Sequence, residues 1–230
     1  MALSITESKK TKKPLTTKQC LLIAVLSLIF GATIFTVAYI GMTQHIGLGT
    51  LNQPILSWMI DYRESYITSI ATTVSMAAGP ISSLLVISFV IFTWVLIKHE
   101  AWRPFLFAIS MGFATLTSMA MKLAISNNRP QQINMIAPFE TTYSFPSGHT
   151  IGIAVFLLVL GYLIYSRHFS IQRFVCWFFV TIIGIGIVAT SRLYLGYHWL
   201  TDIVASLGLG LIILAIIILI DTIVTRNSRN

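Results

Sequence analysis

The pattern of hydrophobic and polar positions divides the chain into long apolar runs separated by short polar segments. Six runs are long enough to be membrane-spanning helices, because about 20 residues at a rise of about 1.5 Å each cross the hydrocarbon core. The predicted spans are Cys20–Met42, Ser69–Ile97, Pro104–Ser126, His149–Tyr165, Phe174–Ala189 and Trp199–Val224. The second span requires a tilt, and the fourth and fifth are short. The pattern predicts an all-α, polytopic membrane bundle with six transmembrane helices.

The length of the first apolar run decides between a retained membrane anchor and a cleaved signal peptide. It exceeds the apolar region of roughly 7–15 residues that is usual in a signal peptide, so an anchor is favoured. We expect a basic cytoplasmic segment at 1–18, one membrane domain at 19–225 and a cytoplasmic tail at 226–230.

The composition supports the membrane assignment. Of the 230 residues, 56% are hydrophobic and only 10% are charged, whereas a soluble domain carries about 25% charged residues. An ordinary soluble globular protein is therefore excluded. The two cysteines, Cys20 and Cys176, are too few for a disulfide framework.

The net charge of +8 would suggest a nucleic-acid partner in a soluble protein. Here the basic residues instead flank the apolar runs, as shown by Lys9, Lys10, Lys12, Lys13 and Lys18 ahead of the first run. With a cytoplasmic N-terminus, eleven of the 15 basic residues, Arg103 among them, fall in cytoplasmic segments. Six spans then leave both termini in the cytoplasm. No nucleic-acid partner is predicted.

The other four basic residues fall at or near the outer face: Arg63, Lys122, Arg129 and Arg192. No role is predicted for Arg63, while the other three recur in the motifs below.

The first outer loop contains an apolar stripe with helical spacing. Its members are Leu51, Ile55, Trp58, Met59 and Tyr62, which follow a helix-start signal at 52–54. Two interpretations stay open. The helix lies in the membrane interface with Asp61 and Glu64 facing water, or it packs under the bundle.

Two cations lie near the end of the third predicted span, one inside it and one just beyond it. Lys122 precedes Arg129 by seven residues, close to two helical turns, so both project from one face if the helix continues. Asn127, Asn128 and Pro130 mark where the helix ends. A snorkelling lysine is the alternative for Lys122 alone. Together the two cations predict a clamp for an anion.

The segment before the fourth predicted span has the features of an anion-binding helix start. Ser147 is a helix cap, Gly148 allows a ligand close to the backbone, and the first N–H groups of the helix are unpaired. Unpaired donors and the helix dipole together favour phosphate. His149 lies beside them as a proton donor. A simple turn with a cap is the alternative for this segment.

The start of the sixth predicted span contains His198 and Asp202, four residues apart. On one helix the two side chains can meet. A carboxylate that accepts one imidazole N–H fixes the tautomer and leaves the other ring nitrogen free as base or nucleophile. A packing pair is disfavoured, because an aspartate in an apolar helix is costly.

The predicted topology places all three clusters at the same membrane face. Lys122, Arg129 and Arg192 contribute three positive charges, and Asp202 removes one. A phosphate monoester carries about −1.5 to −2 charge near neutral pH, so a bound phosphate would nearly neutralise the pocket.

Together these segments resemble the type 2 phosphatidic acid phosphatase (PAP2) superfamily, whose motifs are K-x6-R-P, P-S-G-H and S-R-x5-H-x3-D. Every fixed position is present. The matching residues are Lys122, Arg129 and Pro130; Pro146, Ser147, Gly148 and His149; and Ser191, Arg192, His198 and Asp202.

The resemblance implies catalytic roles for three residues. His198 is implied as the nucleophile that forms a phosphohistidine, Asp202 as the group that orients it, and His149 as the general acid. The implied phosphate-binding groups are Lys122, Arg129, Ser147, Gly148 and Arg192.

No metal-ligand constellation is found in the sequence, so neither a metal nor another cofactor is expected.

The resemblance implies a lipid phosphatase at the outer face of the cytoplasmic membrane, with a substrate that enters from the bilayer. Candidate substrates are undecaprenyl pyrophosphate, phosphatidylglycerophosphate, phosphatidic acid and diacylglycerol pyrophosphate, which would serve cell wall biogenesis or phospholipid metabolism. A lipid phosphotransferase with the same site, and a transporter or lipid-binding membrane protein without enzymatic activity, are the alternatives. The apolar composition argues against a haloperoxidase, which is typically soluble in this superfamily. The oligomeric state stays open.

Overall fold

The structure of the protein is a computed structural model that describes residues 14–227. The regular secondary structure of this part of the chain is entirely helical, with no strand. The predicted basic residues at positions 9, 10, 12, 13 and 229 lie outside the described residues. The α-helices are α1 (Thr17–Gln44), α2 (Asn52–Asp61), α3 (Ser65–Ala77), α4 (Pro80–Lys98), α5 (Trp102–Ile125), α6 (Gly148–Tyr165), α7 (Ile171–Tyr194) and α8 (Leu200–Asn227), with short 3-10 helices at Gly47–Leu51 and Gln132–Asn134.

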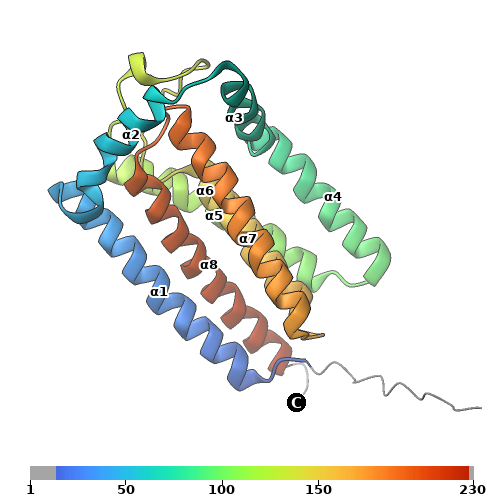
Figure 1. The fold of residues 1–230 in the computed structure, drawn as a ribbon. Coiled ribbons are helices and arrows are strands. Elements are labelled where there is room, and N and C mark those ends of the chain that lie inside the picture. Colours follow the sequence, from blue (N-terminus) through green and yellow to red (C-terminus); the bar gives the residue numbers. More distant parts are fainter. Residues whose placement is uncertain (1–13, 228–230) are drawn as a thin grey trace, which may run out of the picture.

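Six of the described helices are long and apolar enough to cross a membrane, namely α1, α4, α5, α6, α7 and α8 (Figure 1). The predicted count and the all-α class are confirmed. The predicted boundaries of the second span are wrong, because residues 69–97 form two helices. Pro80 has no N–H to continue the α3 ladder and instead occupies the first turn of α4, with Gly79 as the cap.

The ends of the membrane domain lie together. α1 begins with a capping box between Thr16 and Gln19, and the Leu15 N–H donates to the Ser166 carbonyl at the end of α6. In Figure 1 the start of α1 and the end of α8 lie at the same end of the bundle, opposite α2 and α3. A chain that crosses the bundle an even number of times must begin and end on the same side.

The first and last helices pack closely against each other. A Cβ atom added at Gly31 would lie 2.7 Å from the Gly208 carbonyl oxygen, and one at Gly208 would lie 2.6 Å from the Gly31 oxygen. Small residues permit such backbone approach in membrane bundles. The main core forms beside this contact, where Phe107, Val155 and Ile213 are nearly inaccessible.

The loop after the first predicted span forms the predicted helix, α2, which begins at Asn52. The Asn52 side chain accepts from the Thr201 N–H at 3.1 Å and donates to the Thr201 hydroxyl at 3.2 Å, which ties α2 to the start of α8. Leu51, Trp58 and Tyr62 of the stripe are exposed, whereas Leu56 is buried. An exposed apolar stripe favours the interfacial helix over the packing helix.

Arg63 has a role that the sequence did not reveal. Its guanidinium donates to the Tyr194 carbonyl at 2.9 Å and to the Asn134 carbonyl at 2.7 Å. Gly196 lies beside it with a φ of 75°, and an added Cβ there would lie 2.1 Å from the Asn134 oxygen. Arg63 therefore holds two loops together at the end of α7.

Candidate active site

The ends of four helices meet at one end of the bundle. Lys122 lies in the last turn of α5, Gly148 begins α6, Arg192 lies in the last turn of α7, and Asp202 lies in the first turn of α8. The eight predicted site residues occupy these ends and their connecting loops. Several of them make direct contact.

His198 and Asp202 form the innermost contact of the cluster. The Nδ1 atom of His198 lies 3.2 Å from Asp202 Oδ2, and both side chains are inaccessible to solvent. The expected placement of both residues on one helix is wrong, because α8 begins at Leu200. Asp202 instead reaches back, accepting the Trp199 N–H at 2.9 Å and facing the imidazole that precedes the helix.

This arrangement fixes the proton on His198. Because the Asp202 carboxylate accepts hydrogen bonds, Nδ1 of the neutral ring carries the N–H and Nε2 keeps its lone pair. Nε2 lies 3.3 Å from a terminal nitrogen of Arg129, Nη1. The lone pair therefore points toward a cation, as an attacking nitrogen beside a bound phosphate would.

The two cations of the first motif reach the same loop from different elements. The helix does not continue to Arg129, because α5 ends at Ile125, close to the predicted end, and Ser126 adopts a left-handed conformation with a φ of 53°. Lys122 donates to the Tyr143 carbonyl, and Arg129 donates to the Thr142 carbonyl at 2.5 Å. Both cations thus lie against the loop that leads to α6.

The start of α6 has the expected cap. Ser147 Oγ accepts the Thr150 N–H at 3.4 Å and the Thr150 hydroxyl at 3.0 Å, which leaves its own O–H free to donate. A Cβ at Gly148 would come no closer than 3.4 Å to another atom, Ser118 Oγ, so packing alone does not require glycine there. Space for a ligand beside the backbone explains the residue better.

Glu140 is the site residue that sequence reasoning missed. One of its oxygens accepts from Arg192 at 2.5 Å, and the other lies 3.4 Å from Arg129. Arg192 also donates to the Ser75 hydroxyl and stacks 4.4 Å above the Tyr197 ring. The available signal was that Glu140 is the only acidic residue between the third and fourth predicted spans.

Glu140 changes the charge balance of the site. Its carboxylate reduces the excess positive charge from the two expected with Asp202 alone to one. Burial alone would raise the pKa of Glu140, but the hydrogen bond from Arg192 and the charges of Arg192 and Arg129 outweigh it and hold that pKa below its usual value. Glu140 is thus ionised, and it forms ion pairs with two arginines that would otherwise face a phosphate.

A pocket of about 460 Å³ opens beside these residues. His149, Arg192, Glu140 and Tyr197 line its polar side, and residues at the α3–α4 junction, including Met76 and Ile81, line its apolar side. His149, which is partly buried, thus faces the same space as Arg192. No group of three His, Cys, Asp or Glu side chains with metal-site geometry occurs among residues 14–227.

His198 should remain neutral well into the acidic range. Burial first, and then the charges of Arg129, Arg192 and Lys122, lower the pKa of His198 well below its usual value. A nitrogen NMR titration of the imidazoles, assigned with His198→Gln, should show no protonation of His198 between about pH 7.5 and about pH 5.5. A midpoint near pH ~6.5 would contradict the buried, cation-flanked environment.

Comparison with known proteins gives the family. A family model described as the PAP2 superfamily matches residues 103–226, more than half of the chain. Phosphatidylglycerophosphatase B of Bacillus subtilis (strain 168) is 26% identical over 157 residues, which cover 66% of this chain and 73% of that protein.

Two solved structures share the fold. A transmembrane PAP2-type phosphatidylglycerolphosphate phosphatase from Bacillus subtilis has a TM-score of 0.72 at 20% identity, covering 86% of this chain and 95% of that one. LpxE from Aquifex aeolicus has a TM-score of 0.55 at 18% identity, covering 74% and 94%.

The matched region contains α5 to α8 and therefore every residue that the three motifs contribute to the site. The resemblance predicted from the motifs is confirmed. The chain, with six apolar helices and this matched region, is a membrane protein that belongs to the PAP2 superfamily.

Proposed function

We propose that this protein hydrolyses a lipid phosphate through a phosphohistidine at His198, without a metal, at the outer face of the cytoplasmic membrane. The observation that carries the proposal is the chain of contacts from Asp202 to His198 Nδ1 and from Nε2 to Arg129. It provides an oriented, neutral nucleophile beside a cation. The PAP2 family supports a phosphatase over a transporter.

The reaction has two steps. The Nε2 lone pair attacks phosphorus, a P–N bond forms, and the P–O bond to the lipid breaks as His149 donates a proton to the leaving oxygen. Water then cleaves the P–N bond with His149 as base, which returns both histidines to their starting states. Asp202 stabilises the positive ring during the first step.

The cations and N–H groups stabilise the transferring phosphoryl group. Lys122, Arg129 and Arg192 approach from three elements, and the start of α6 supplies the Ser147 hydroxyl and the Gly148 backbone. Phosphoryl transfer depends mainly on positioning and charge stabilisation, so such a pocket is sufficient without a metal ion.

Two apolar spaces support a substrate with acyl chains. The site pocket is bounded by the α3–α4 junction, and a second pocket of about 300 Å³, lined by Val74, Val86, Gly152 and Phe156, also borders that junction. Gly152 lies one helical turn after His149. A lipid whose phosphate lies in the site could therefore extend its chains toward the bilayer at this place.

The similarity to phosphatidylglycerophosphatase B supports a glycerophospholipid phosphate, with phosphatidylglycerophosphate first among the candidates. Undecaprenyl pyrophosphate, phosphatidic acid and diacylglycerol pyrophosphate complete the set.

The test is phosphate release by purified protein from these four lipids and from a water-soluble phosphate monoester. Release should be fastest from phosphatidylglycerophosphate and should persist in EDTA. Binding without release from any lipid would favour a lipid-binding protein. Full activity that is lost in EDTA and restored by Mg²⁺ would overturn metal independence. Phosphate transfer to an added lipid acceptor in preference to water would identify a phosphotransferase.

Filling the second apolar pocket should slow lipid hydrolysis selectively. A Cβ atom added at Gly152 would meet no atom within 4 Å, so the leucine of Gly152→Leu can leave the helix without a clash at its Cβ and extend into the pocket. We expect kcat/KM for the lipid to fall about tenfold, while that for the water-soluble phosphate stays unchanged. Gly186→Leu, a helical glycine with equal space beside a different pocket, is the control. Equal loss in both variants would contradict the chain-binding role.

Removing the Glu140 charge should strengthen phosphate binding. Glu140→Gln releases two arginines from a competing carboxylate and removes a repulsion of roughly 1 kcal/mol at this partly exposed position. The inhibition constant of inorganic phosphate should fall about fivefold. Glu64→Gln, at an exposed carboxylate outside the site, is the control. A higher inhibition constant would show that Glu140 instead orients the arginines for phosphate.

A further inference from the structure

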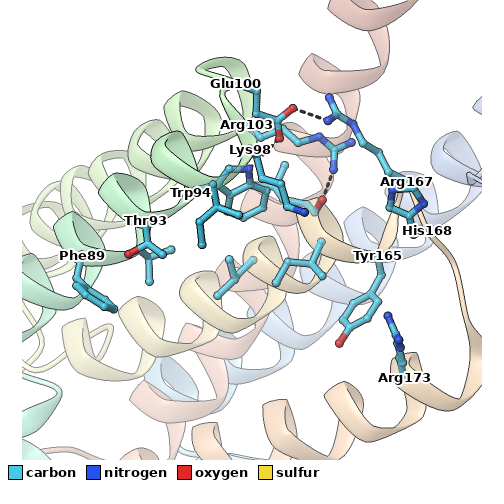
Figure 2. Close-up of a pocket in the computed structure, with 15 residues that line it drawn as sticks. Phe89, Thr93, Trp94, Lys98, Glu100, Arg103, Tyr165, Arg167, His168 and Arg173 are labelled. Atoms are coloured by element: carbon cyan, nitrogen blue, oxygen red, sulfur yellow. Dashed lines mark hydrogen bonds and ion pairs between the residues drawn. The ribbon is translucent and has the colours of Figure 1, made fainter.

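A third pocket lies at the end of the bundle opposite the candidate active site, where α1 begins and α8 ends. It has a volume of about 510 Å³ and lies between α4, the end of α6 and the start of α7. Figure 2 shows Lys98, Arg103, Arg167 and Arg173 around it, with Glu100 as the acidic residue of the group. We call it the basal groove.

Two of the four cations in the basal groove are already neutralised. Arg167 pairs with Glu100, whose other oxygen accepts from the Trp94 indole at 2.8 Å. Arg103 is buried, donates to the Leu163 carbonyl and the Ser166 hydroxyl, and lies 3.9 Å from Asp221.

The other two cations remain uncompensated. Among the described residues, Lys98 and Arg173 have no hydrogen-bond or ion-pair partner, and both side chains are exposed at the groove. The Nε atom of Arg103 is also buried without a partner. The groove therefore offers two free positive charges and one unused buried donor.

The remaining wall of the basal groove is apolar. Phe89, Val90 and Ile97 of α4 face Leu160, Leu163 and Ile164 of α6 across it. Phe89 to Ile97 covers about 12 Å of helix, a length that takes up part of an acyl chain. Trp94 and Tyr165 also line the groove, and aromatic side chains of this kind are common at membrane interfaces.

We propose that the basal groove binds an anionic phospholipid, with the headgroup phosphate between Lys98 and Arg173 and one acyl chain along the α4–α6 wall. The charge complementarity selects an anionic headgroup over a zwitterionic one, because a choline or ethanolamine would add a third cation to the two that are free. The apolar wall selects a lipid over a free phosphate. The site is distinct from the phosphatase site and is independent of the activity proposed there.

Photolabelling of the full chain in phosphatidylcholine nanodiscs tests this site. The probes are phosphatidylserine and phosphatidylcholine that each carry a diazirine in one acyl chain, and labelled peptides are located by mass spectrometry. The serine probe should label residues 89–98 and 160–165 about 25-fold more than the choline probe, since each of the two free cations contributes about fivefold. Equal labelling of these peptides by both probes would overturn the proposal.

Charge variants locate the headgroup. Lys98→Gln and Arg173→Gln should each reduce labelling by the serine probe about fivefold, since one cation near the membrane surface is worth about that factor. Lys18→Gln removes an exposed cation at the same end but outside the groove, and it should have no effect. An equal loss with Lys18→Gln would reveal diffuse surface attraction instead of a site.

A competition experiment on the unaltered protein tests the site without relying on the folding of any variant. Unlabelled phosphatidylserine should displace the serine probe from both peptides, whereas unlabelled phosphatidylcholine and inorganic phosphate should not. Displacement by inorganic phosphate alone would show an anion site that does not recognise lipid, and displacement by phosphatidylcholine would show an unselective apolar groove. Either result contradicts the proposal.

Discussion

His198→Ala should abolish phosphate release, with a loss of at least about a thousandfold. The imidazole supplies the only Nε2 lone pair beside Arg129, and no other side chain in the described contacts occupies that position. The measurement is phosphate release from a radiolabelled lipid, together with quenching of the reaction to trap the phosphoenzyme. The unaltered protein should yield an acid-labile phosphoprotein, and the variant should yield none.

His45→Asn is the matched control for this loss. His45 is an exposed histidine in a left-handed conformation at the end of α1, a conformation that asparagine also adopts. It should keep full activity. An active His198→Ala protein would overturn the nucleophile assignment and leave the Asp202 contact with a structural role only.

Asp202→Asn should reduce kcat by about 10³- to 10⁴-fold while the fold is kept. Asparagine lacks the negative charge that stabilises the positive ring, and where its amide N–H group faces His198, Nδ1 must accept and the ring proton moves to Nε2. The attacking lone pair is then lost, although the side chain keeps its shape. Rates measured with saturating lipid, and an unchanged elution volume in detergent, separate this effect from misfolding.

Asp61→Asn, at an exposed carboxylate on α2, is the control for Asp202→Asn and should leave kcat unchanged. A near-normal rate for Asp202→Asn would show that the Trp199 N–H and neighbouring contacts hold His198 in its reactive tautomer without the carboxylate.

The meeting of the three motifs at one end of the bundle could be predicted from the sequence, because successive spans alternate in direction. Lys122, Ser147, Arg192 and Asp202 lie near span ends that alternate along the chain, so a correct span count brings them to one face. The helix cap at Ser147 was predictable from residue type alone. The local geometry was not, since α5 ends before Arg129 and α8 begins after His198.

The missed features depend on loop conformation. Glu140 reaches Arg129 and Arg192 from a loop of more than 20 residues, and no periodic pattern fixes where such a loop returns. Arg63 likewise contacts carbonyl groups 71 and 131 positions away. Gly79 and Pro80 are residue types that mark a helix break. The apolar residues on both sides nevertheless made 69–97 look like one continuous span.

The close contact of Gly31 with Gly208 has a consequence for biogenesis. Of the six described spans, α1 leaves the ribosome first and α8 last, so α1 waits for its α8 partner until the other four have been made. His198 and Asp202 are also delivered only with that final span. The proposed phosphatase site is therefore completed only when α8 joins the other described spans, and a chain that is truncated before α8 lacks Asp202.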